Sequence, residues 1–162
     1  MTDIKRLFTH YLLQLKVIVS KTPPEIFPCS LSEGMFSLEM HAKIAANFTL
    51  RGYCPLLNVD PVSFYREEIG RDAVLSQIED TLVYLADASD INEFDDSKFI
   101  VDKAGSSDIE LCQSEFIHLY IFPNFLFHIS MVYAIAKANG VTLGKGDFDG
   151  FHAYPSGFSF VK

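Results

Sequence analysis

The segment from Asn124 to Asn139 constrains the fold most, because it is apolar nearly all round a helix. Only Ser130 and Lys137 interrupt it, and at 100° per residue both fall on one side of the helix. The buried centre of this helix is therefore expected on the opposite side, close to Asn124 and His128.

Both ends of this segment carry helix signals. Pro123 either kinks a helix that starts in a short turn at Ser114 or occupies the first position of a new one. At the other end, Asn139-Gly140 is a typical stop, because glycine tolerates a left-handed backbone. Residues 141–162 are rich in glycine and are expected to lie as an extended segment across the surface.

Three further segments repeat apolar residues at spacings of three and four, which is typical of amphipathic helices. They are predicted at about residues 3–20, capped by Thr2 or Asp3, at about 35–51 and at about 69–88. The intervening residues 25–34 and 52–68 contain proline and are expected to be connectors. Four helices in one domain, residues 1–162, predict an all-α, antiparallel four-helix bundle.

The periodicity changes between Lys98 and Leu111. Two short β-type runs flank Ala104-Gly105-Ser106-Ser107, which predicts a small β-hairpin just before the last helix. The preceding residues 87–98 are rich in acids and are expected to form a solvated connector.

Length and charge narrow the class of protein. The 162 residues fit one domain. Acidic residues outnumber basic ones 21 to 13, for a net charge of −8, so nucleic acid is not an expected partner. No apolar stretch is expected to reach the roughly 18 to 20 residues of a membrane helix, and the N-terminus lacks the features of a signal peptide. A membrane is therefore not expected either.

The three cysteines, Cys29, Cys54 and Cys112, are widely spaced and form no CxxC pair. This spacing argues against a disulfide framework and against a thiolate zinc site. We expect three thiols, buried or half-buried, in a reducing cytoplasm.

The second helix supplies an inward-pointing histidine. Its apolar stripe consists of Phe36, Met40, Ile44 and Phe48. On a helical projection His41 lies on the flank of this stripe and is predicted to point inward, whereas Glu39 and Lys43 lie outside it.

Three polar side chains, His41, Asn124 and His128, thus fall on predicted core faces. Asn124 and His128 are four residues apart, which places them on one helix face. Bundle cores are where helical proteins assemble metal sites from facing helices, and imidazoles suit zinc, nickel, copper or iron. The alternative is that these residues are hydrogen-bonded core residues without a metal. His118 is a reserve ligand, whereas His10 and His152 are weaker candidates.

The sequence contains few signs of other catalytic or binding chemistry. The sequence contains no GxGxxG, Walker, GxSxG or HExxH motif. The run Gly144–Phe148 is interpreted as a structural turn and not as a phosphate loop. The adjacent acids Glu67-Glu68 and Asp95-Asp96 point in different directions and are expected on the solvated surface.

The C-terminal third carries a specific resemblance. It reads Phe122-Pro123-Asn124-Phe125-Leu126-Phe127-His128, then a helix ending in Asn139-Gly140-Val141, then Leu143-Gly144-Lys145-Gly146-Asp147-Phe148. This pattern resembles a bacterial family of unknown function within the DinB-like (YfiT-like) superfamily. The start of the second helix, Met35-Phe36-Ser37-Leu38, is also similar to that family.

The resemblance implies a four-helix bundle, often a homodimer, that holds zinc or nickel with three histidines. By position these ligands fall on His41, Asn124 and His128, so Asn124 stands where the superfamily has a histidine. Characterised members include thiol-dependent transferases and isomerases, in which the metal lowers the pKa of a thiol.

Two functions follow as hypotheses. In the first, a divalent metal at His41 and His128, with Asn124 and water, activates a thiol or water for transfer or hydrolysis. In the second, the protein is a non-catalytic, dimeric, small-molecule-binding or structural protein. Its ancestral metal site has then become a buried hydrogen-bond network in which Asn124 bonds to His128 or His41.

Overall fold

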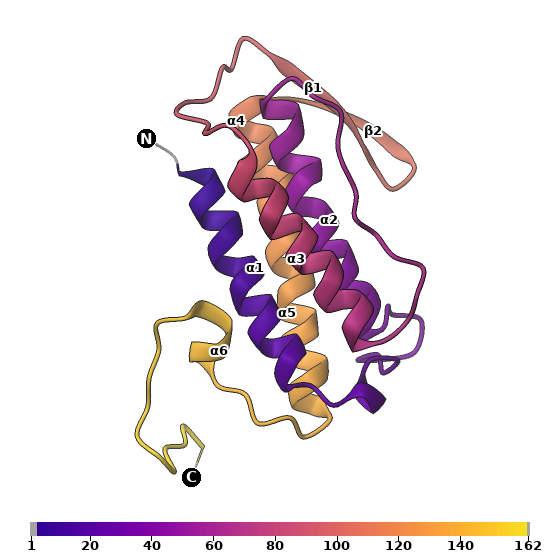
Figure 1. Ribbon diagram of the computed structural model, residues 1–162, viewed down its shortest axis with the longest axis vertical. Coiled ribbons are helices and arrows are strands. Elements are labelled where there is room, and N and C mark those ends of the chain that lie inside the picture. Colours follow the sequence, from indigo (N-terminus) through magenta and orange to yellow (C-terminus); the bar gives the residue numbers. More distant parts are fainter. Residues whose placement is uncertain (1–2, 162) are drawn as a thin grey trace.

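Four long helices pack into one bundle in the computed structural model, which describes residues 3–161 (Figure 1). They are α1 (Ile4–Lys21), α2 (Leu38–Leu56), α3 (Arg71–Asp87) and α5 (Phe122–Ala138). A hairpin of β1 (Phe99–Ala104) and β2 (Ser107–Cys112) precedes α5. The short segments are η1 (Pro24–Ile26), α4 (Gln113–Glu115), the π-helical η2 (Phe116–Ile121) and α6 (Lys145–Asp149). The all-α bundle with a small hairpin before its last long helix is confirmed.

Helix α1 forms as the sequence predicts. The Asp3 carboxylate accepts a hydrogen bond from the backbone N–H of Arg6 at 2.9 Å, which caps the first turn. The other predicted cap, Thr2, lies outside the described residues. The apolar face of the helix is buried and consists of Ile4, Phe8, Leu12, Leu15, Ile18 and Val19.

The directions of the helices follow from their contacts. Helices α1 and α3 run antiparallel, because Lys5 pairs with Asp90 and Lys16 pairs with Glu79. Helices α2 and α5 also run antiparallel. His41, near the start of α2, contacts His128 within α5, whereas Gly52, near the end of α2, packs against Ile121, just before α5 begins. Helices α2 and α3 are parallel, because residues 57–70 cross the length of the bundle to connect them (Figure 1).

Helix α2 differs from the predicted range of 35–51. It begins at Leu38, capped by the Ser37 hydroxyl, and continues to Leu56. The predicted loop start at Gly52 is wrong because packing overrides the local signal. A Cβ on Gly52 would overlap the Ile121 side chain, so glycine here permits close approach of α2 and η2. Pro55 is accommodated in the last turn.

The interpretation of Lys43 as lying outside the core stripe also needs correction, because its side chain is only 3% exposed. The Lys43 ammonium lies 2.8 Å from the Glu39 carboxylate and donates to the carbonyls of Arg66 and Glu68. The Tyr65 ring lies beside it, 5.3 Å from centroid to nitrogen. The long connection between α2 and α3 therefore covers this face of α2 and supplies the buried ammonium with acceptors.

The hairpin is tied to the bundle by Arg51 on α2. Its guanidinium pairs with Asp102 at 2.6 Å and donates to the Tyr120 hydroxyl oxygen at 2.9 Å. The neighbouring acids Asp95 and Asp96 are exposed as predicted. Asp96 nevertheless has a local role, because its carboxylate accepts hydrogen bonds from the N–H and hydroxyl of Ser114.

The last long helix starts close to Ser114, as one of the two predicted alternatives has it, because α4, η2 and α5 form one continuous helical stretch, Gln113–Ala138. Pro123 lies in the first turn of α5, where a missing N–H is tolerated. Within the described residues this stretch is long and apolar enough to cross a membrane, by length and composition alone, so the expectation that none exists is wrong. One side of the stretch packs in the bundle core, where Phe125, Ile129 and Val132 are fully buried.

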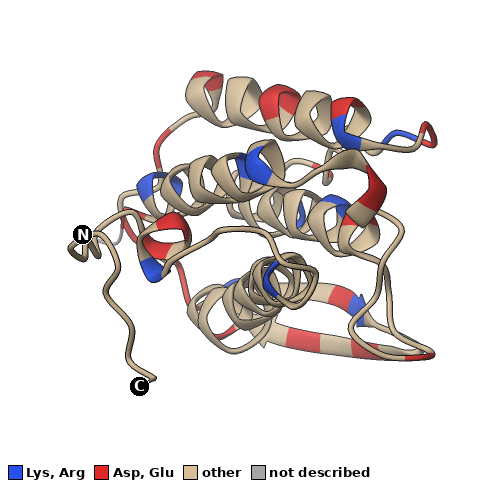
Figure 2. Cartoon of the chain, turned by 90° about the horizontal axis from the view of Figure 1, so that it is seen from below, with Lys and Arg blue, Asp and Glu red and all other residues tan. Residues whose placement is uncertain are grey.

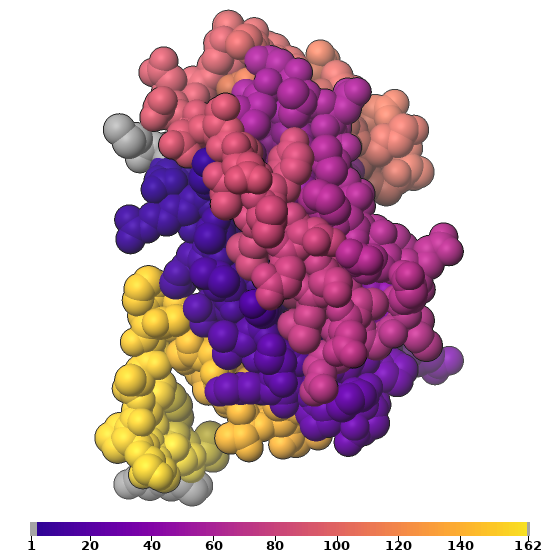
Figure 3. Space-filling view, viewed as in Figure 1, coloured from indigo at the N-terminus to yellow at the C-terminus, as the bar shows by residue number. Residues whose placement is uncertain are grey.

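The end of α5 and the C-terminal segment are partly as predicted. Gly140 is left-handed (φ +85°), and the N–H of Val141 bonds to the Ala136 carbonyl, which confirms the stop. The segment beyond is not wholly extended. Residues 145–149 form α6, because the Asp147 carboxylate caps the Gly144 N–H. Figure 3 shows the C-terminal segment at one corner of the molecule, where α6 contacts α1.

Candidate functional site

Two buried histidines meet between α2 and α5. The Nδ1 atoms of His41 and His128 are 2.8 Å apart, within hydrogen-bond distance. The two side chains are only 2% and 8% exposed. The antiparallel packing of α2 against α5 brings them together across 87 positions of sequence. The prediction that both histidines point into the bundle is confirmed.

Aromatic rings surround the pair. Phe48 stacks on His128, with ring centroids 5.7 Å apart and planes 24° apart. Phe127 lies edge-on to both imidazoles, and Phe36 lies edge-on to His41. Phe36 and Phe127 are themselves about half exposed, so they form the outer wall of the site.

These surroundings keep both imidazoles neutral. Burial lowers the pKa of His128 to about 4, and the adjacent His41 imidazole contributes in the same direction. Burial also lowers the pKa of His41 below its ordinary value of 6.5. At neutral pH each ring therefore carries one proton and one unprotonated nitrogen, the form in which histidine binds metals.

The hydrogen bond between the rings requires one of the two Nδ1 atoms to be protonated. His41 Nε2 is buried and has no hydrogen-bond partner, whereas His128 Nε2 is not among the buried unpartnered atoms. An orphaned buried N–H is the rarer arrangement in proteins. We therefore assign the shared proton to His41 Nδ1, which donates to His128 Nδ1, and leave His128 Nε2–H facing solvent.

Asn124 lies one turn before His128 but outside the hydrogen bond between the histidines. Its side-chain N–H donates to the Tyr120 carbonyl at 2.7 Å. The hypothesis that Asn124 bonds directly to His128 or His41 therefore finds no counterpart among the hydrogen bonds of the described residues. The Asn124 side-chain oxygen makes no hydrogen bond to another described group and is available to a ligand.

The other histidines lie elsewhere. His118, the reserve ligand, is exposed on η2, with its ring edge-on to Phe94. His10 binds the carbonyl of Asp149, and His152 pairs with the Asp149 carboxylate. None of the three contacts the buried pair.

The donor set fits a divalent metal that is held by few protein ligands. The Nδ1 atoms of two neutral imidazoles converge and share one proton, and His41 Nε2 is buried without a protein partner. Within residues 3–161, however, no cluster contains three or more His, Cys, Asp or Glu side chains. Catalytic zinc sites usually have three protein ligands, so water or substrate would have to complete this shell.

Sequence reasoning missed the aromatic wall. Phe36 and Phe48 were recognised only as parts of an apolar stripe, and Phe127 was not singled out. Phe127 directly precedes His128, and Phe36 and Phe48 lie five residues before and seven residues after His41, which is the signal that could have revealed their roles. Figure 2 shows Lys and Arg on separate elements, with no basic stripe visible on the described residues in that view.

Similarity to a known sequence family shows where the chain belongs. Residues 11–149 match the model of a family described as a domain of unknown function, DUF1993. The chain belongs to the DUF1993 family. This match covers every element that builds the histidine pair, from most of α1 to α6.

One solved structure links DUF1993 to a wider fold. It is the crystal structure of a DinB family member protein from Shewanella denitrificans, which is 22% identical to this chain. The match covers 94% of this chain and 92% of the other, with a TM-score of 0.74. At this identity the likeness shows that the chain has the fold of that DinB family member. No curated protein matches the chain.

Proposed function

We propose that the protein is a divalent-metal-dependent transferase or hydrolase whose metal, zinc or nickel, binds at His41 and His128. The observation that carries this proposal is the convergence of two neutral imidazole nitrogens, 2.8 Å apart, in the bundle core. Asn124 supports it, because its free side-chain oxygen lies one turn from His128 on the same helix.

The chain's own residues would prepare this site for chemistry. When bound, the metal would act as a Lewis acid that lowers the pKa of a thiol or water. Phe48 and Phe127 pack against the His128 ring and hold its plane in place. The lowered pKa of both histidines keeps both rings neutral near pH 7, the form that binds metals.

Metal titration tests this proposal. The protein, purified without a histidine tag, is incubated with Zn²⁺ or Ni²⁺, and bound metal is measured after gel filtration. We expect about one ion per chain, with affinity reduced about 10- to 100-fold or more by His41→Ala or His128→Ala. The matched controls His118→Ala and His152→Ala should retain the metal.

A second candidate function is favoured by the hydrogen bond itself. The Nδ1 atoms of His41 and His128 already satisfy one another, which is the arrangement expected in a non-catalytic, small-molecule-binding or structural protein. Metal binding at both Nδ1 atoms would move a proton to His41 Nε2, a buried atom without a partner, which opposes binding. The same titration decides between the two: no bound metal in the wild type would refute the first proposal and leave the second.

The remaining expectations from the superfamily resemblance stay as proposals. We propose a homodimer in the cytoplasm that acts on a thiol or another small molecule, without nucleic acid or membrane partners. The half-exposed Phe36 and Phe127 beside His41 support an apolar ligand or contact at this surface.

A further inference from the structure

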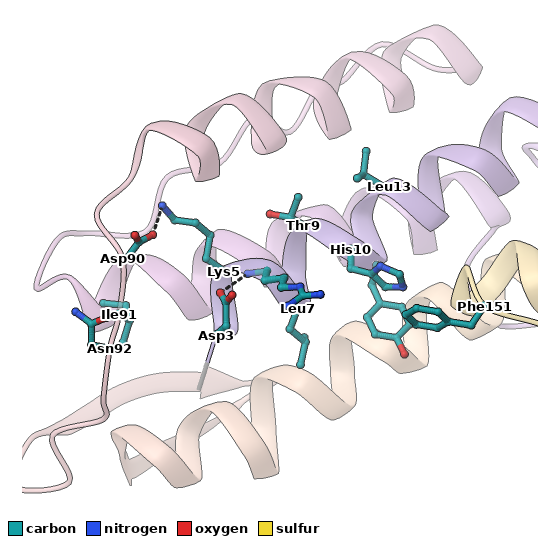
Figure 4. A pocket seen from close by; sticks show the side chains of 12 residues that line it. Asp3, Lys5, Leu7, Thr9, His10, Leu13, Asp90, Ile91, Asn92 and Phe151 are labelled. Carbon is teal, nitrogen blue, oxygen red and sulfur yellow. Dashed lines mark hydrogen bonds and ion pairs between the residues drawn. The ribbon is translucent and has the colours of Figure 1, made fainter. Parts of the chain in front are cut away.

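A cavity of about 740 Å³ lies along α1 (Figure 4), and neither His41 nor His128 lines it. Its two ends are formed by segments that come later in the chain. Residues 90–92 border one end, and Phe151 from the C-terminal segment borders the other. This volume lies in the range of small-molecule sites in proteins.

At the charged end of the cavity, one basic side chain has no ion-pair partner among the described residues. Lys5 is occupied, because it pairs with Asp90 and donates to the Ala88 carbonyl. The Asp3 carboxylate caps the backbone of α1. The Arg6 guanidinium lines the cavity but makes no ion pair or side-chain hydrogen bond with any described residue. Its planar donors suit an anionic oxygen ligand.

The opposite end offers an aromatic surface. The Phe151 ring stacks on His10, with centroids 5.0 Å apart and planes 15° apart. Phe151 is 79% exposed, so the ring face turned away from His10 is open. The apolar side chain of Leu7 lines the cavity as well. A second aromatic ring can therefore stack here.

The position of Phe151 is fixed by the turn that precedes it. His10 Nε2 donates to the Asp149 carbonyl at 2.7 Å, and the Asp149 carboxylate accepts the N–H of Phe151 at 2.8 Å. Gly150 is left-handed (φ +75°), and a Cβ there would lie 2.9 Å from the Gln14 side chain. The aromatic surface is thus held in place before any ligand binds.

We propose that this cavity binds a small aromatic molecule that carries an anionic group. The anion would pair with Arg6, and the ring would stack at Phe151. Arg6 and His10, the residue on which Phe151 stacks, are four residues apart on α1, a rise of about 6 Å along the helix axis. This site uses neither His41 nor His128 and does not depend on the function proposed for them.

Fluorescence titration with 1-anilinonaphthalene-8-sulfonate, an anionic aromatic probe, tests the proposal. We expect saturable binding of about one probe per chain. Arg6→Gln and Phe151→Ala should each weaken it by about tenfold, since a charge-assisted contact or a stacked ring is lost. Gly150→Ala should also weaken it, because it displaces Phe151 without removing a contact group.

Matched controls and a neutral probe make the result specific. Lys103→Gln and Phe99→Ala alter an exposed cation and an exposed ring on the hairpin and should leave affinity unchanged. The uncharged probe N-phenyl-1-naphthylamine should lose affinity with Phe151→Ala but not with Arg6→Gln. The proposal would be overturned if neither Arg6→Gln nor Phe151→Ala changed the affinity for the probe, or if the affinity fell equally in the hairpin controls.

Discussion

Replacement of Lys43 by methionine should lower the free energy of unfolding by about 3 to 5 kcal/mol, the cost of breaking a buried ion pair. The change leaves the Glu39 carboxylate, which is only 13% exposed, without its ammonium partner. It also leaves the carbonyls of Arg66 and Glu68 without the donor that they share. Urea unfolding followed by circular dichroism measures the loss.

Two further variants show whether burial is the cause. Lys16→Met breaks an ion pair with Glu79 whose members are both exposed, and it should cost less than about 1 kcal/mol. The double variant Lys43→Met/Glu39→Met removes both buried charges and should recover part of the loss. If Lys43→Met cost no more than Lys16→Met, the role assigned to Lys43 would be wrong.

Acid should destabilise the protein well above the range in which carboxylates titrate. The pKa of His128 is about 4 in the folded chain, against 6.5 for the ordinary side chain. Between these two pKa values, His128 therefore binds a proton in the unfolded chain but not in the folded chain. The free energy of unfolding has its full value above about pH 6.5 and falls as the pH drops toward 4. At 1.36 kcal/mol per pKa unit, the loss is about 3 kcal/mol.

Urea unfolding at several pH values between 7 and 4 tests this prediction. His128→Gln removes the titrating group, so its stability should depend much less on pH across that interval, whatever its absolute stability. Four carboxylates have pKa values lowered from 3.8, so the stability that they contribute is lost only as the pH falls below about 3.8. They are Asp95, Asp96, Asp147 and Asp149. An unchanged pH dependence in His128→Gln would show that the imidazole pair is not buried as described.

The helices and the histidine pair could be predicted from local signals. Spacings of three and four residues locate α1, and the left-handed Gly140 ends α5 where the sequence indicates. His41 and His128 could be assigned inward directions because each lies on or beside an apolar face. Their direct hydrogen bond depends on how α2 packs against α5, which no local pattern contains.

The errors have a common physical origin in tertiary contacts. Lys43 lies on the polar side of α2, and its burial results from a connection more than 20 residues away in sequence. Gly52 is a local helix breaker, yet close packing against Ile121 retains it inside α2. The spacing of Asn124 and His128 predicted a shared network, but the nearby Tyr120 carbonyl takes the asparagine N–H instead.

The central claim is that His41 and His128 form one buried, neutral pair that a divalent metal can occupy. Long-range ¹H–¹⁵N spectra of the histidine side chains at pH 7, with and without Zn²⁺, test it most directly. We expect a protonated Nδ1 in His41, an unprotonated Nδ1 in His128, and zinc-induced shifts confined to these two rings. Two imidazoles that titrate independently near pH 6.5, or zinc shifts at His10, His118 or His152 alone, would contradict the account.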